Sequence, residues 1–226
     1  MRINNLKDEK KHISYFCTTN LHKKEKDFRR AIFFDRDGVL IKDVNYINDP
    51  DKVTLLKGVT KLLRYTHKLG FLNIVVTNQS GISRNFFSWK DYEKVTKRMC
   101  KIIDHPNPIH AIYANGEGPN ELHPNESWRK PNPNMILKAS EDFKIDLSKS
   151  ILIGDRLSDI QCGENAGLKY LVHVRTGHGH LEREKVVEKY CEQNKNLNLI
   201  LINDLSYLQR GRFFKDVFFG KGPKSY

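Results

Sequence analysis

The stretch AIFFDRDGVL (residues 31–40) decides the fold of this chain. Its first five residues, AIFFD, are too apolar for a half-exposed strand, so they predict a strand covered on both faces, as in the centre of a parallel sheet. Two carboxylates, Asp35 and Asp37, lie at the end of this strand, and Gly38 allows a sharp turn after them. Both carboxylates can therefore face a single substrate atom.

Apolar runs and amphipathic segments alternate along the rest of the chain. The apolar runs predict strands at 71–78, 111–115, 150–155 and 169–174. The segments between them predict helices at 58–70, 88–104, 131–143 and around 159–166. This alternation implies right-handed crossovers, so we expect an α/β protein with a doubly wound parallel sheet.

The two ends of the chain suggest additions to this sheet. A helix at 181–193, an apolar run at 197–203 and a short helical turn after it are expected to extend or flank the sheet. HISYFC (12–17) is a candidate for one more strand. We expect one main domain at 30–210, between a basic N-terminal extension (1–29) and a basic aromatic C-terminal tail (211–226), whose aromatic pairs predict packing or a partner surface.

The composition excludes several classes of protein. No run approaches the roughly 18 apolar residues of a membrane span, and the basic start lacks the apolar core of a signal peptide. The four cysteines are scattered without a CxxC pair, which argues against disulfides and a cysteine-rich metal site. We therefore expect a cytoplasmic protein with no membrane partner, and a monomer.

The net charge of +12 gathers partly at the two ends of the chain. Such a charge is compatible with nucleic acid, with a small anionic substrate or with plain solubility. Because the terminal bases are better explained as solvated or surface-packed tails, nucleic acid is not an expected partner.

The residues that could take part in a reaction lie at the ends of the predicted strands, and ligands bind at this edge of open parallel sheets. Asp35 can accept a phosphoryl group covalently, while Asp37 can supply and remove protons. The alternative, a DxDG calcium loop, requires further spaced oxygen ligands and a glutamate at its twelfth position, whereas VLI follows here. We therefore favour phosphoryl transfer.

Three further motifs follow later strands. The turn from Thr77 to Ser80 offers a hydroxyl and backbone N–H groups to phosphate oxygens. Lys130, before a proline-started helix, can neutralise charge on a transferring phosphoryl group. Asp155 brings a third carboxylate to the same edge, where it can complete an oxygen-rich magnesium site with Asp35. Asp159, four residues later, is expected to support this site, with orientation of Lys130 as one role and a helix-start carboxylate as the alternative.

The order DxDG, TNQ, KP and GDxxxD, each behind a predicted strand, is identified as the pattern of haloacid dehalogenase superfamily phosphatases. Over roughly residues 30–178 the chain resembles heptose bisphosphate and histidinol phosphate phosphatases, through AIFFDRDGVL, LLKGV, VVTNQSGISR, RKPNPNM and IGDRLSDIQCGENAG. TNQSGISR and DVNYI look more like the D-glycero-D-manno-heptose-1,7-bisphosphate 7-phosphatase family. Histidinol-phosphate phosphatase, and a 3'-phosphatase acting on nucleic acid ends, remain the alternatives.

The resemblance implies an attack by Asp35 on the C7 phosphate of the heptose bisphosphate, in the making of nucleotide-activated heptose. Asp37 would act first as acid and then as base, and Thr77 and Lys130 would stabilise the phosphoryl group. Mg²⁺ would be held by Asp35, the backbone carbonyl of Asp37, and Asp155. The family pattern places the following residues at the substrate: Asp43, Val44, Asn45, Tyr46, Thr77, Asn78, Gln79, Ser80, Arg129, Lys130 and Arg156. Arg129 is the candidate for gripping the remaining C1 phosphate.

Two departures concern the loops. The intervals from Asp37 to Thr77 and from Thr77 to Lys130 are mostly used by predicted strands and helices, so no large cap domain is expected. Many relatives carry three cysteines and a histidine before the RKP motif as a zinc site. The loop at 113–131 contains no cysteine and a single histidine, so zinc is not expected here.

Other candidates have simpler interpretations. His178 and His180 are expected to be non-ligating residues of a surface loop, and His173 is expected to be packed or hydrogen-bonded within a strand. An aromatic cluster is expected to pack against the start of a helix, with contact to the substrate loop as the alternative; it comprises Phe86, Phe87, Trp89 and Tyr92.

Overall fold

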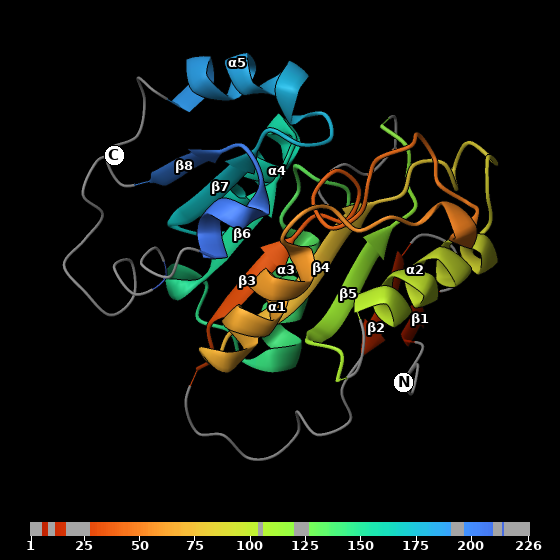
Figure 1. Ribbon diagram of the computed structural model, residues 1–226, viewed down its shortest axis with the longest axis horizontal. Coiled ribbons are helices and arrows are strands. Elements are labelled where there is room, and N and C mark those ends of the chain that lie inside the picture. The colour runs from red at the N-terminus through yellow and green to blue at the C-terminus, as the bar shows by residue number, and fades with distance from the viewer. Residues whose placement is uncertain are drawn as a thin grey trace.

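The computed structural model describes residues 6–8, 12–16, 28–103, 106–119, 127–190, 197–209 and 214. Within these ranges, eight strands form one sheet in the order β1-β2-β5-β4-β3-β6-β7-β8 (Figure 1). Their bounds are β1 Leu6–Asp8, β2 His12–Phe16, β3 Ala31–Phe34, β4 Leu72–Asn78, β5 Ile109–Asn115, β6 Ile151–Gly154, β7 Tyr170–Val174 and β8 Asn198–Ile202.

The six strands from β3 to β8 run parallel, which confirms the predicted doubly wound sheet. The segment HISYFC also supplies a strand, as considered from the sequence. That strand, β2, pairs antiparallel with β5, and β1 pairs antiparallel with β2. The N-terminal residues therefore widen the parallel sheet beyond β5.

Helices cover both faces of the sheet (Figure 1). The bounds of the α-helices are α1 Val59–Lys68, α2 Trp89–Ile103, α3 Asn134–Phe143, α4 Leu157–Asn165 and α5 Gly179–Tyr190. Short 3₁₀ helices are η1 Pro50–Lys52, η2 Leu147–Lys149 and η3 Leu205–Gln209. All the predicted helices are present, with ends that differ by a few residues. Within the described ranges, no helix is both long and apolar enough to cross a membrane.

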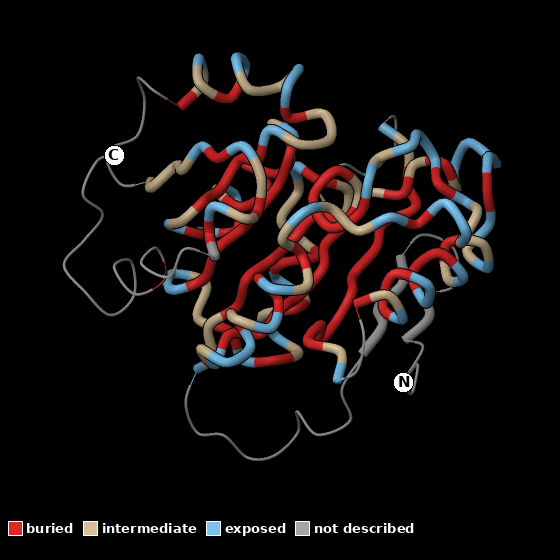
Figure 2. The backbone as a smooth tube through the Cα atoms, viewed as in Figure 1, coloured by how far each residue is buried: buried red, intermediate tan, exposed pale blue. Residues whose placement is uncertain are grey.

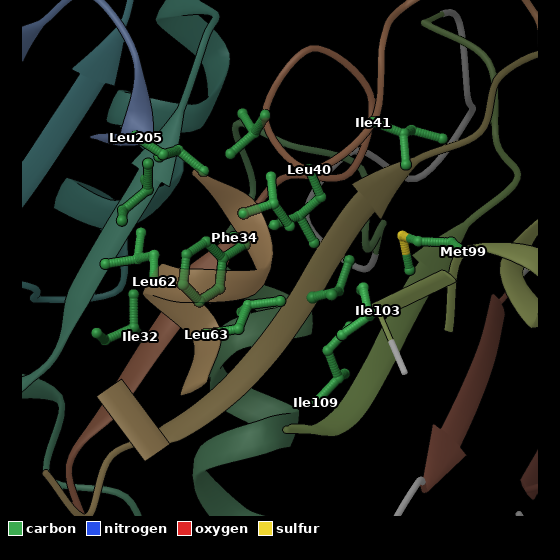
Figure 3. Close-up of a cluster of buried hydrophobic side chains, with 14 of the residues drawn as sticks. Ile32, Phe34, Leu40, Ile41, Leu62, Leu63, Met99, Ile103, Ile109 and Leu205 are labelled. Atoms are coloured by element: carbon green, nitrogen blue, oxygen red, sulfur yellow. The ribbon is translucent and has the colours of Figure 1, made fainter. Parts of the chain in front are cut away.

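The core has two parts, one on each face of the sheet, because successive residues of a strand point to opposite faces. Ile32 and Phe34 of β3 pack with residues of α1, α2 and η3 (Figure 3). Ala31 and Phe33 pack with residues of α3, α4 and α5. The central strands are buried along almost their whole length while the helices expose their outer sides (Figure 2). This burial on both faces explains why β3 reads as a continuous apolar run.

One residue of the C-terminal tail belongs to the first part of the core. Phe214 is fully buried, with ring centroids 6.1 Å from Tyr65 of α1 and 5.8 Å from Phe71. Packing, one of the two roles expected for the tail, is thus confirmed for this residue. The other tail residues and most of the extension before residue 28 lie outside the described residues, and the domain limits stay predictions.

Candidate active site

The strand order brings three of the predicted motifs to one edge of the sheet. β3 lies between β4 and β6, so Asp35, the end of β4 and Asp155 are neighbours although they are far apart in sequence. A cavity of about 350 Å³ opens there. The predicted residues that line it are Asp35, Asp37, Asp43, Asn45, Tyr46, Asn78, Gln79, Ser80, Arg129, Lys130 and Arg156.

Lys130 lies at the centre of this edge. Its buried ammonium is 2.7 Å from Asp35 Oδ1 and 2.6 Å from Asp159 Oδ1, and it donates to the carbonyl of Val76 at 3.0 Å. Burial lowers the pKa of Lys130, but the carboxylates of Asp159 and Asp35 more than offset this effect, so the net shift is upward. Lys130 therefore stays charged beside Asp35, and the contact with Asp159 fits the orienting role considered for that residue.

Asp155 is fully buried next to this pair. Its Oδ2 accepts a hydrogen bond from the backbone N–H of His178 at 2.7 Å, whereas its buried Oδ1 has no hydrogen-bond partner. Oxygens of Asp35, Asp155 and Asp159 all lie within 4.8 Å of one another. An unpartnered buried oxygen in a group of carboxylates is the donor set that a hard divalent cation prefers, so these residues fit magnesium.

The pKa values of Asp155 and Asp35 indicate that these buried carboxylates lack sufficient positive charge around them. Burial, and then the charges of Asp159 and Asp35, raise the pKa of Asp155 to about 9. Burial raises the pKa of Asp35 to about 6, although Lys130 acts in the opposite direction. A cation beside these carboxylates would favour their ionised forms.

Two glycines leave room for the Asp155 carboxylate. Gly38 (φ +85°) and Gly177 (φ +58°) have left-handed backbones. A Cβ on Gly38 would lie 2.3 Å from Asp155 Oδ2, and one on Gly177 would lie 2.2 Å from it. Only glycine satisfies both the backbone conformation and this close approach.

Asp37 is held by two neighbours. Arg36 donates to both its carboxylate oxygens, from Nε at 3.0 Å and from Nη2 at 3.2 Å. Gln79 donates from Nε2 to Asp37 Oδ2 and to Thr77 Oγ1, both at 2.8 Å. The side chain of Gln79, predicted to contact substrate, thus makes hydrogen bonds that orient Asp37, while part of the residue still lines the cavity.

Arg36 supports Asp37, a role that was not expected from the sequence. Its guanidinium is fully buried, lies 4.8 Å from the ring centroid of Tyr92 and contacts Thr96 Oγ1 at 3.4 Å, both residues of α2. A single basic residue between two aspartates carries no signal of burial, because its partners come from a helix far along the chain. The planar fork of arginine suits this two-point grip on a carboxylate.

Of the other residues at the end of β4, Asn78 and Thr77 have structural contacts and Ser80 faces the cavity. Asn78 accepts from the Lys130 N–H at 3.0 Å and donates to the Lys130 carbonyl at 3.1 Å, so it fixes the backbone of that residue. Thr77 is almost fully buried behind Gln79 and does not line the cavity. Ser80 reaches the cavity wall.

The segment from Asp43 to Tyr46 forms one side of the cavity, except that Val44 is exposed and does not line it. Asp43 Oδ2 is 3.0 Å from His178 Nε2 and 3.8 Å from Arg156 Nη2. His178, expected to be a non-ligating residue of a surface loop, does lie in a turn; it also lines the cavity, and its backbone N–H donates to Asp155.

Besides the buried Arg36, three arginines line the cavity: Arg84, Arg129 and Arg156. Arg84, the last residue of the stretch TNQSGISR, had no role expected from the sequence; it donates to the hydroxyl of Tyr46 at 2.7 Å. Burial, and then Arg84 and Arg156, lower the pKa of Arg129. Guanidinium groups remain charged at neutral pH, so this part of the cavity attracts anions.

His173 and the aromatic cluster can also be compared with their expected roles. His173 is buried and its Nε2 is 3.0 Å from the carbonyl oxygen of Asp155, so it is hydrogen-bonded within the sheet as expected. The aromatic cluster does both things considered for it. Tyr92 packs in the core, whereas Phe87 lines the cavity and Phe86 contacts Tyr46 at 4.8 Å between ring centroids. Residues 120–126 of the loop without cysteines lie outside the described residues.

Comparison with known proteins identifies relatives of this chain. The HAD-hydrolase-like family model matches residues 127–194. D-glycero-alpha-D-manno-heptose-1,7-bisphosphate 7-phosphatase of Burkholderia mallei is 40% identical over 62% of this chain and 76% of its own length. The D-glycero-beta-D-manno-heptose-1,7-bisphosphate 7-phosphatase of Haemophilus influenzae is 37% identical over 66% of this chain and 83% of its own length. The enzyme of the same name from Pasteurella multocida is 33% identical over 81% of this chain and 98% of its own length.

Solved structures share the fold. A HAD-like phosphatase from Mesorhizobium loti superposes with a TM-score of 0.74 at 25% identity, covering 90% of this chain and 92% of its own. A D,D-heptose 1,7-bisphosphate phosphatase from B. bronchiseptica, complexed with magnesium and phosphate, superposes with a TM-score of 0.67 at 24% identity, covering 80% and 96%. The extent of the sequence identity to the bacterial relatives shows that this chain belongs to the D-glycero-D-manno-heptose-1,7-bisphosphate 7-phosphatase family of HAD-like hydrolases.

Proposed function

We propose that this protein is a phosphatase that removes the C7 phosphate of D-glycero-D-manno-heptose 1,7-bisphosphate. The observation that carries the proposal is the contact of Lys130 Nζ with Asp35 Oδ1 at 2.7 Å, beside an Asp37 held by Arg36 and Gln79, in a member of this family. A carboxylate nucleophile, an acid–base carboxylate and a fixed cation at one cavity are the groups that phosphomonoester hydrolysis through an aspartyl-phosphate requires.

The first step transfers the phosphoryl group. The Asp35 carboxylate attacks phosphorus as the bond to the sugar oxygen breaks, and Asp37, in its protonated form, gives its proton to the leaving alkoxide. In the second step water attacks the phosphorus of the aspartyl-phosphate, Asp37 takes a proton from this water, and Asp35 and inorganic phosphate are released. Lys130 offsets negative charge on the phosphoryl oxygens in both steps.

Magnesium would be held by the carboxylates of Asp35 and Asp155 and by the backbone carbonyl of Asp37. When bound, it supplies positive charge that screens the nucleophile from the phosphate and stabilises the charge of the transferring group. Asp159 is already engaged by Lys130 and by the backbone N–H groups of Asp155 and Arg156, so we assign it to support rather than to the metal. Zinc is not part of this proposal.

The second phosphate of the substrate is proposed to lie near the arginines. Arg129, with Arg84 and Arg156 in the same cavity, offers bidentate donors to a phosphate that remains attached during the reaction. The described connections from β3 to α1 and from β4 to α2 contain η1 and loops, without a cap domain, so an extended bisphosphate has access. Histidinol phosphate, with a single phosphate, would leave this charge unused.

Phosphate release from a panel of substrates tests the proposal. The panel contains both anomers of the heptose bisphosphate, histidinol phosphate and a 3'-phosphorylated oligonucleotide, each with and without Mg²⁺. We expect magnesium-dependent preference for a heptose bisphosphate; a clear preference for histidinol phosphate or the oligonucleotide would refute the substrate assignment.

The nucleophile is tested separately with Asp35→Asn, which should fold and lose turnover. Asp146→Asn, at a surface carboxylate near the opposite end of the strands, is the matched control and should keep turnover. Comparable activity in the two variants would rule out the aspartyl-phosphate route. A cytoplasmic, monomeric enzyme remains our prediction, to be checked by cell fractionation and light scattering.

A further inference from the structure

Glu117 is a buried carboxylate that the mechanism above does not use. It lies two residues beyond the end of β5 and is 5% exposed. Acidic side chains are seldom so deeply buried unless they are paired or hydrogen-bonded, so its partners indicate its role. Those partners lead to Arg129.

Two chains of hydrogen bonds connect Glu117 to Arg129. In the first, the hydroxyl of Ser127 donates to Glu117 Oε2, and Ser127 Oγ accepts from the backbone N–H of Arg129 at 3.0 Å. In the second, Arg129 Nη1 donates to the backbone carbonyl of Glu117 at 3.1 Å. Residue 117 thus fixes both the backbone and the guanidinium of Arg129.

The segment that carries Glu117 is itself well anchored. The carbonyl of Asn115 accepts from the backbone N–H of Gln79 at 2.6 Å, and Asn115 Oδ1 accepts from the N–H of Glu117 at 3.3 Å. The carbonyl of Gly116 accepts from the N–H of Ser83, the residue before Arg84, at 3.2 Å. The same short segment therefore fixes the relative positions of the loops that bear Arg84 and Arg129.

Such support is needed because the arginines repel one another. Burial contributes most to the lowered pKa of Arg129, and the charges of Arg84 and Arg156 lower it further, whereas Tyr46 and Glu117 act in the opposite direction. An arginine on an unsupported loop would move away from like charges into solvent, where its charge is better hydrated. A tethered arginine instead offers its donors to an incoming phosphate without first being ordered.

We infer that Glu117 is a positioning residue that holds Arg129 toward the cavity and so sets the preference for substrates with a second phosphate. This inference rests on the proposed function, in which Arg129 receives the phosphate that is not cleaved. Glu117 does not contact the reacting atoms, and its effect is expected mainly in KM for the bisphosphate.

The test compares a heptose 1,7-bisphosphate with p-nitrophenyl phosphate, which has one phosphate, using the full chain with Mg²⁺. For Glu117→Ala we expect the ratio of kcat/KM for the two substrates to fall about tenfold or more, through KM for the bisphosphate. Glu117→Gln keeps an acceptor for the Ser127 hydroxyl and should retain most of the preference. Glu141→Ala, at an exposed glutamate of α3, is the matched control and should keep the parent ratio.

A double-mutant cycle shows whether Glu117 acts through Arg129. In an Arg129→Ala background, Glu117→Ala should change the ratio by less than about twofold, because the positioned group is gone. Additive effects, or a Glu117→Ala enzyme that keeps the parent ratio, would overturn the inference. If Glu117→Ala does not fold, Ser127→Ala, which removes the same bridge, takes its place with the same expected and refuting results.

The parent enzyme separates this inference from the proposed function. A parent that shows no preference for the bisphosphate would refute the proposed substrate, and the inference with it. A parent with a clear preference that Glu117→Ala retains would refute the inference alone. A purely structural role for Glu117 would lower thermal stability and affect both substrates alike, leaving the ratio unchanged, and that result would also overturn it.

Discussion

Replacing Asp155 by asparagine should make the metal-free protein more stable and remove its response to magnesium. Asp155 is fully buried, its Oδ1 has no hydrogen-bond partner, and its pKa is raised to about 9. At pH 7 the folded, metal-free protein therefore keeps this acid protonated, whereas the unfolded chain ionises it. Asparagine is a neutral group of similar shape, so it avoids this difference between the two states.

The size of the effect follows from the two pKa values. With an unfolded pKa of 3.8, about three pH units separate that value from pH 7, and each unit corresponds to about 1.4 kcal/mol. The upper limit is therefore about 4 kcal/mol, and we expect about 2 to 4 kcal/mol after relaxation of the site. For a chain of this length that corresponds to a rise in Tm of roughly 5 to 15 °C.

The sign of the pH dependence is also fixed. The folded pKa of Asp155 lies above the unfolded one, so its contribution to stability is fully present below pH 3.8 and is lost as the pH rises toward 9. The advantage of Asp155→Asn over the parent should consequently shrink as the pH is lowered from 7 toward 4. Magnesium should stabilise the parent more at high pH, where the carboxylate ionises more readily to bind it.

Thermal unfolding followed by circular dichroism, with EDTA or with Mg²⁺ at several pH values, measures these effects. Asp146→Asn serves as the control, since this surface carboxylate lies away from the cluster, and it should respond to magnesium as the parent does. A lower metal-free Tm for Asp155→Asn would refute the argument from the raised pKa of Asp155, and the full stabilisation by magnesium would refute its assignment as a metal ligand.

Three other predictions concern the surroundings of the site. Arg36→Lys keeps a charge but loses the fork that holds Asp37, so kcat should fall about tenfold or more in steady-state assays of a folded variant; unchanged kcat would contradict the positioning role. Phe214 is fully buried, so Phe214→Ala should lower the free energy of unfolding by about 3 to 5 kcal/mol in urea titrations. Tyr207→Ala, at a half-exposed side chain, should lower it by less than about 1 kcal/mol. Burial lowers the pKa of His173 to about 4, so stability is lost as the pH falls from above 6.5 toward 4, by up to about 3 kcal/mol. A His173→Asn protein with the same acid-dependent loss in urea midpoint would argue against that contribution.

The fold could be predicted largely from local patterns. Strands buried on both faces, such as β3 and β4, are rich in apolar residues, and the segments between them show the spacing of helices packed on one side. The chemical residues could be placed as well, because Asp35 and Asp155 follow such strands directly. These are properties that neighbouring residues in the sequence determine.

Contacts between distant parts of the chain were not predictable in this way. Arg36 is buried against α2, where its guanidinium stacks on Tyr92 and donates to Thr96. His178 was expected to be a plain loop residue, yet it lies beside Asp43, more than a hundred positions earlier in the chain. A single sequence carries no periodic signal for a partner of that kind, so the supporting residues of the site emerged only with the structure.

The pairing of β2 with β5 has a consequence for handling this protein. β5 is a fully buried strand of seven residues, and β2 occupies the hydrogen-bonding groups along Ala111–Asn115. A chain shortened to begin at residue 30 would keep the residues of the active site but would present that backbone to solvent. Exposed edges of this kind recruit strands from other copies, so we expect the shortened chain to aggregate more readily than the full chain.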